Sequence, residues 1–263
     1  MEIRNRVWLG LGVVVATSAA FYVGTSDTQN GMSHDMDAMA EEGGEGGEGA
    51  STADAIASDS VYLAQLAFIR GHLNVGVNLY REGEVEASAT HMKHPGDELY
   101  TDLLPAMESR GALDFADQLE DLANAVEAQA PIAEVEAAYA ALLSAIDAAE
   151  NVVDDLDART LGAVMVDLVR TAAAEYDIAV GDEGQLENEH EYQDSLGFVR
   201  IAKEKMPLLE TLSDNSAAIM AIETQLDSIL PTWPGLRAPS TLTTEPSLIY
   251  SAASRIEIAT LQL

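Results

Sequence analysis

Three histidines lie close together in the sequence and could bind a metal ion. His72 precedes a glycine-containing break at Gly83, and His91 and His94 follow it. If the flanking segments form an antiparallel helical hairpin, a rise of ~1.5 Å per residue places the three imidazoles about 12–16 Å from the turn. They would then lie at one level, where His72 can face either or both of the others. Imidazoles with a nearby carboxylate, such as Glu98, suit iron, zinc or copper.

These residues also have a structural interpretation. His72 could be a core residue that bonds a backbone carbonyl, and His94 could sit at a helix end, where its charge interacts favourably with the helix dipole. Because the residue before a proline avoids helical geometry, a helix is expected to end at His94 and another to begin at Pro95. We nevertheless predict metal ligands at His72, His91, His94 and Glu98.

A second glycine-centred segment carries acidic groups where the first carries histidines. Glu175 precedes Gly184, and Glu191 and Asp194 follow it at comparable distances. Carboxylates with the phenols of adjacent tyrosines favour a hard cation, above all Fe(III). The other interpretation is a solvated acidic face. The sequence leaves open whether the two segments share one site or form two.

Helices must position all of these groups. From about residue 58 onward, apolar residues recur at the three- and four-residue spacings typical of helices. We expect an all-α protein whose residues 58–263 form an antiparallel helical bundle. This bundle could consist of two duplicated helical hairpins. The expected helices cover 59–81, 84–94, 96–109, 112–129, 132–150, 156–181, 187–211, 215–230 and 246–263.

The composition excludes several functions. The chain has 263 residues, with 13 Lys and Arg against 45 Asp and Glu, so its net charge is −32. Such a chain cannot neutralise phosphates, which excludes nucleic-acid binding. The absence of cysteine excludes disulfides and thiolate metal sites. We find no nucleophile or zincin motif and predict that the chain is not an enzyme, a ferroxidase-like activity being the one enzymatic alternative retained.

The N-terminus predicts export. Arg4 and Arg6 precede an apolar run from Val7 to Gly24, which can span a bilayer with its N-terminus inside. Residues 1–24 are therefore a signal anchor or a signal peptide. The length favours the anchor, whereas the small residues 18–20 permit cleavage. The remainder lies on the periplasmic face of the inner membrane, or free in the periplasm if the signal is removed.

Residues 25–57 are expected to form a disordered linker rich in Gly and Glu. The run EEGGEGGEG at 41–49 has no apolar side chain to bury. Just before it, Met32, His34, Met36 and Met39 could capture a soft ion such as Cu(I), or could simply belong to an ordinary disordered stretch.

The segment 174–202, AEYDIAVGDEGQLENEHEYQDSLGFVRIA, resembles the periplasmic helical extension of high-affinity iron permeases and the related imelysin-like, iron-uptake-associated helical proteins. The residues that carry the resemblance are Glu175, Tyr176, Ala179, Val180, Gly184, Asn188, Glu191, Tyr192, Phe198 and Ala202. The resemblance implies a periplasmic bundle of two hairpins that handles iron or copper, with Glu175 and Glu191 as ligand candidates.

These observations together predict an exported, membrane-tethered protein that binds iron or copper. It would serve metal uptake or delivery beside an inner-membrane permease or oxidase, since the chain has no permease membrane domain of its own. The alternative is a structural helical adaptor that binds a partner protein in the periplasm without metal.

Overall fold

The structure of the chain is a computed structural model that describes residues 51–181 and 183–263, apart from the side chains of Asp97 and Glu98. The predictions for residues 1–24 and for the Met- and His-containing stretch lie outside the described residues. Within the described part, no helix is both long and apolar enough to cross a membrane.

The described residues are predominantly helical and contain no named β-strand, which confirms the all-α class. The elements in chain order are α1 (Thr52–Ala57), α2 (Asp59–Glu82), α3 (Val85–His94), the π-helix η1 (Pro95–Leu99), α4 (Tyr100–Arg110), α5 (Ala116–Glu127), α6 (Ile132–Glu150), α7 (Ala158–Ala179), α8 (Glu189–Glu204), α9 (Met206–Leu212), α10 (Ser216–Ile229), the 3₁₀-helix η2 (Leu230–Thr232) and α11 (Pro246–Thr260).

Local signals set the ends of the helices. The side chain of Ser58 accepts a hydrogen bond from the Val61 N–H at the start of α2, and Asp157 accepts one from Thr160 at the start of α7. At the C-terminal end of α2, Gly83 adopts φ = 86°, a left-handed conformation that glycine reaches without strain. This turn reverses the chain and makes α2 and α3 the predicted hairpin.

Three of the differences from the expected helix boundaries have a clear local cause. The predicted helix 96–109 begins with the π-helix η1, at Pro95, which lacks an N–H for the α-helical ladder. The predicted helix 187–211 divides at Lys205 into α8 and α9, with Pro207 in the first turn of α9. The short helix α1 occupies the last six residues of the predicted linker, where the Ser51 side chain accepts from the Asp54 N–H.

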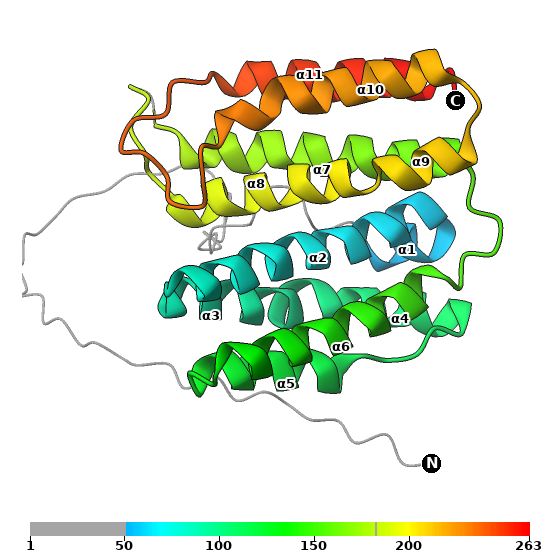
Figure 1. Cartoon of the computed structure of the whole chain (residues 1–263). Coiled ribbons are helices and arrows are strands. Elements are labelled where there is room, and N and C mark those ends of the chain that lie inside the picture. Colours follow the sequence, from blue (N-terminus) through cyan, green and yellow to red (C-terminus); the bar gives the residue numbers. More distant parts are fainter. Residues whose placement is uncertain (1–50, 182) are drawn as a thin grey trace, which may run out of the picture. The chain divides into compact units, whose positions relative to one another are not determined.

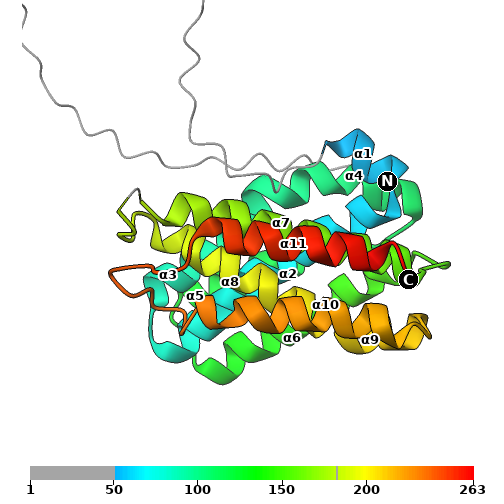
Figure 2. The same cartoon turned by 90° about the horizontal axis from the view of Figure 1, so that it is seen from above.

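Helix α2 lies at the centre of the described fold (Figure 1). It contacts α3 and α6 on one side and α7 and α8 on the other. Helices α10 and α11 run side by side and cover the far face of α7 and α8 (Figure 2). Because α2 is covered from both sides, most of its residues are buried, and any polar side chain there must find a partner inside the protein.

Candidate metal site

The α2–α3 hairpin brings the three predicted histidines together. The ring centroid of His72 lies 4.6 Å from that of His94 and 6.4 Å from that of His91. Close contact between the helices maintains this register, because Gly76 leaves room for Met92 and its carbonyl accepts a 2.7 Å hydrogen bond from Ser88. The predicted in-register arrangement of His72, His91 and His94 is therefore present.

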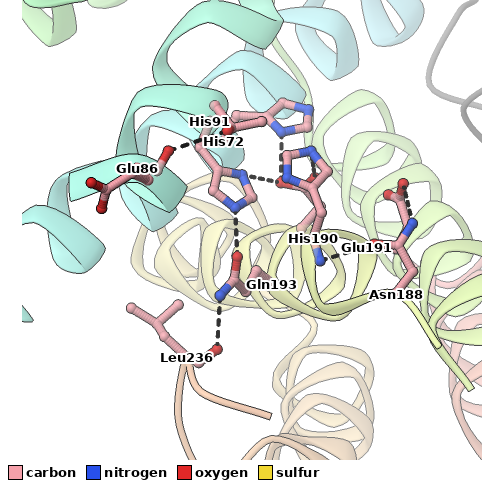
Figure 3. A network of polar contacts seen from close by, with 10 residues as sticks. His72, Glu86, His91, Asn188, His190, Glu191, Gln193 and Leu236 are labelled. Carbon is pink, nitrogen blue, oxygen red and sulfur yellow. Dashed lines mark hydrogen bonds and ion pairs between the residues drawn. The ribbon is translucent and has the colours of Figure 1, made fainter. Parts of the chain in front are cut away.

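Helix α8 adds two further groups to the same cluster. One carboxylate oxygen of Asp194 lies 2.6 Å from Nδ1 of His72 and 3.0 Å from Nδ1 of His91. Its other oxygen lies 3.0 Å from Nε2 of His190, one turn earlier on α8. The His190 ring stacks on His91 with a centroid distance of 4.2 Å. Figure 3 shows how His72, His91 and His190 converge from the three helices.

A close crossing of α2 and α8 allows this convergence. A Cβ atom on Gly197 would lie 2.8 Å from the carbonyl oxygen of Gly71, and one on Gly71 would lie 2.5 Å from the Phe198 ring. Larger residues would hold the helices apart. Since Gly71 precedes His72 and Gly197 lies one turn beyond Asp194, the two glycines determine how closely these two polar side chains approach.

The interior of the cluster is closed and one side faces solvent. The side chains of His72, His91 and Asp194 are 0 % exposed, whereas that of His190 is 22 % exposed. An ion would therefore enter most directly past His190. Once inside, it would be held by groups that have no contact with bulk water.

Electrostatics keep Asp194 ionised. Burial alone would raise the pKa of its carboxyl, but the adjacent charges and hydrogen bonds of His72 and His91 outweigh burial and hold that pKa well below its usual range. Burial lowers the pKa of His190 to about 4, because the other three imidazoles add to the effect and Asp194 only partly opposes it. His190 is consequently a neutral imidazole at neutral pH, the form that binds metals.

The three glutamates of the predicted ligand set lie outside the cluster or are not described. Glu175 is fully buried on α7, and Glu191 on α8 accepts a 3.2 Å hydrogen bond from Asn188. Within the described residues, the ligand atoms that lie close enough to share an ion belong to His72, His91 and Asp194, and neither glutamate is among them. The side chain of Glu98 lies outside the described part of the chain.

The neighbouring phenols are engaged in packing. Tyr192 donates a 3.0 Å hydrogen bond to the Gly235 carbonyl, and burial raises its pKa to about 12. Tyr176 contacts the Trp233 ring edge-to-face. Both tyrosines therefore hold the loop between α10 and α11 against α7 and α8.

The candidate site contains two residues that the predicted ligand set lacks, His190 and Asp194. Asp194 was recognised only as part of an acidic segment, and His190 carried no spacing signal relative to the first hairpin. Their i, i+4 spacing on α8 does place both on one helical face, which is the signal that could have found them.

The donor set fits a transition-metal ion. One ligand atom each from His72, His91 and Asp194 lie within 4.8 Å of one another. Their combination of imidazole nitrogen and carboxylate oxygen suits iron, zinc or copper. The rings of His94 and His190 border the same space, with centroids 5.8 Å apart, and could complete the coordination.

The C-terminal part of the chain matches one family model. Residues 154–262 match the family model of the iron permease-associated 4-helix bundle domain. The matched range contains α7, α8, α9, α10 and α11. If α8 and α9 are counted as one interrupted helix, these elements correspond to the four helices of the family description. No curated protein and no solved structure matches the chain significantly.

The match includes only one side of the candidate site. His190 and Asp194 lie within the matched range, whereas His72, His91 and His94 precede it on α2 and α3. The cluster therefore lies where helices from outside the matched range pack on the helices within it.

Proposed function

We propose that this protein is an exported, membrane-tethered accessory of metal uptake or delivery that binds a transition-metal ion, iron first and copper second. The observation that carries the proposal is the buried convergence of His72, His91 and Asp194 from three helices, with His94 and His190 beside them. The iron permease-associated bundle in the same chain supports iron as the ion.

The charge and burial of the cluster favour an ion over a purely structural network. Burying a carboxylate is costly unless a cation or strong hydrogen bonds compensate it. Here several imidazoles surround one carboxylate, and neutral imidazole is the form that coordinates metals. A divalent ion would add positive charge beside the buried Asp194 carboxylate.

The proposed partner is an inner-membrane permease or oxidase. The support is the association that the family description itself states, together with the sequence pattern of an N-terminal anchor. In this arrangement the protein holds the ion outside the inner membrane and transfers it to the membrane partner.

A titration of the full-length chain in detergent tests metal binding directly. Fe(II), Fe(III), Cu(I), Cu(II) and Zn(II) would be titrated into the wild type and into a triple variant with His72→Ala, His91→Ala and His94→Ala. The control is Arg255→Ala at an exposed position of α11, outside the histidine cluster. We expect saturable micromolar or tighter binding in the wild type and the control, and its loss in the triple variant. Circular dichroism would verify that the triple variant remains helical.

The same experiment identifies the alternative. If the wild type binds none of the ions with saturation, or if the triple variant binds as tightly as the wild type, the histidine cluster is structural. The helical adaptor would then be the better description. Stopped-flow absorbance of Fe(II) mixed with oxygen would show in the same samples whether bound iron is oxidised faster than free iron.

A further inference from the structure

We propose that Gln193 is a positioning residue that fixes the ring tautomer of His91, so that His91 presents the lone pair of Nδ1 toward Asp194 and the bound ion. This inference rests on the proposed function for its consequence, namely metal affinity. Its structural core, the tautomer, can be tested without any metal.

The direction of the hydrogen bonds follows from a backbone carbonyl. The Gln193 side-chain amide contacts the carbonyl oxygen of Leu236 at 3.2 Å, and a carbonyl oxygen can only accept. The NH₂ group of Gln193 must therefore face Leu236, which turns Oε1 of Gln193 toward His91. That oxygen lies 2.8 Å from Nε2 of His91, so Nε2 must carry the proton (Figure 3).

The other ring nitrogen then faces the carboxylate. In a neutral imidazole only one nitrogen is protonated, so Nδ1 of His91 has a lone pair. Nδ1 is fully buried and lies 3.0 Å from Oδ1 of Asp194. Two acceptor atoms at this distance repel each other unless both contact a cation, which can be a proton or a metal ion. The relay from Leu236 through Gln193 thus prepares a cation-binding pair.

The protein holds the start of this relay in place. Leu236 belongs to the loop between η2 and α11. The two residues that follow it in this loop, Arg237 and Ala238, each contact another element. The backbone N–H of Ala238 donates to Glu189 at 3.0 Å, at the start of α8, and Arg237 forms an ion pair with Glu84 at the α2–α3 turn. With Gln193 itself 5 % exposed, water has little access to replace its hydrogen bond to His91.

Two substitutions of Gln193 distinguish the effect of its acceptor oxygen from the effect of its side-chain shape. Gln193→Met keeps a side chain of similar length but removes the acceptor, so Nε2 of His91 loses the partner that favours its proton. Gln193→Glu keeps an acceptor oxygen in either protonation state. Gln225→Met, at a partly exposed position of α10 outside the cluster, is the matched control for a change from Gln to Met.

The first measurement reads the tautomer in the metal-free full-length chain. Long-range ¹H–¹⁵N correlation spectra of ¹⁵N-histidine-labelled protein at pH 9 distinguish the two nitrogens of a neutral ring, with His91→Asn used for assignment. We expect the Nε2–H tautomer of His91 in the wild type, Gln193→Glu and Gln225→Met. In Gln193→Met the proton should move to Nδ1, where the Asp194 carboxylate accepts it.

The second measurement is the affinity for Fe(II) and Zn(II). Loss of a residue that orients a ligand typically weakens metal binding about 10–100-fold, which is the effect expected for Gln193→Met. Gln193→Glu should restore affinity to within a few-fold of the wild type, a rescue that a purely structural role would not produce.

Each result bears on a different proposal. An Nδ1–H tautomer of His91 in the wild type would overturn the inference even if Gln193→Met did not fold. So would an unchanged tautomer and affinity in a folded Gln193→Met variant. A wild type that binds no ion would instead remove the proposed function, while the tautomer spectra would still decide the role of Gln193.

Discussion

Asp194 is the residue on which the candidate site depends most, because imidazoles from three helices contact its two oxygens. Asp194→Asn keeps the shape of the side chain and removes its charge. Since changing even an outer partner of a metal ligand costs about 10–100-fold in affinity, we expect a loss at the upper end of that range or beyond. Titrations with Fe(II) and Zn(II) would measure it, with Asp177→Asn on the exposed face of α7 as the control. Equal affinity in both variants would argue against Asp194 as a ligand.

His190 should make the metal-free protein sensitive to mild acid. Its pKa is about 4 in the folded chain and 6.5 in the reference state, because burial and the facing rings of His72, His91 and His94 outweigh Asp194. Between those values the unfolded chain binds a proton that the folded chain does not, so folding stability falls as pH decreases through this window. The partly exposed ring limits the effect to about 2 kcal/mol at pH 4.

Urea unfolding of the metal-free wild type and of His190→Gln at pH 7 and pH 5 would measure this contribution. The comparison between the two chains removes the effect of the many carboxylates, which titrate similarly in both. We expect the wild type to lose more stability than the variant. Equal losses would mean that His190 is protonated as readily in the folded chain as in the unfolded one.

The sequence could supply the residues of one hairpin but not those contributed by another. His72, His91 and His94 are separated by one short turn, so the rise per residue places them at one level. Asp194 and His190 reach the cluster through the packing of α8 on α2, whose register depends on side-chain contacts far apart in the chain. The sequence therefore leaves open whether the acidic segment shares a site with the histidines, and it does not identify Asp194 as their partner.

At the scale of the elements, the crossing of α2 and α8 is the contact that assembles the site. In Gly197→Ala the added methyl group would meet the Gly71 carbonyl oxygen and a Val75 methyl, both at 2.8 Å. Backbone atoms cannot rotate away, so we expect the helices to separate at a cost of about 1–3 kcal/mol. Metal affinity should fall as well, because His72 and Asp194 would move apart.

Thermal unfolding and Fe(II) titration of Gly197→Ala would test this prediction. Gly96→Ala is a matched control, since it lies in the helical segment η1 and its Cβ would meet nothing within 4 Å. A Gly197→Ala chain as stable as this control, with unchanged affinity, would show that the two helices can adjust at no cost.

The helices themselves were largely predictable, because periodic apolar residues and terminal signals are local. Gly83 ends α2 where expected, and the start of a new element at Pro95 follows from proline stereochemistry. The kink at Lys205 was not anticipated, although Pro207 follows it. Proline is tolerated in the first turn of a helix, so its presence alone does not distinguish a break from a continuous apolar pattern.

At the scale of the whole molecule, acidic charge opposes folding. With 13 cationic side chains against 45 acidic ones, most carboxylates have no cation of their own. Ion pairs such as Arg110–Asp59 and Lys203–Asp227 occur, but exposed pairs contribute about 0–1 kcal/mol each. Repulsion among the remaining acids extends over the Debye length, about 30 Å at 0.01 M salt and about 3 Å at 1 M.

Salt should therefore stabilise this protein. Screening weakens both the ion pairs and the repulsion, and at a net charge of −32 the loss of repulsion is the larger effect. We expect the thermal midpoint of the full-length chain in detergent to rise from 10 mM to 1 M NaCl and to continue rising where simple screening is nearly complete, as cations accumulate at the acidic surface. Tetramethylammonium chloride at the same ionic strength separates screening from association with small cations, since its bulky ion approaches carboxylates less closely. A midpoint that stays flat across the NaCl series would show that the acidic side chains are too far apart in the folded chain to destabilise it.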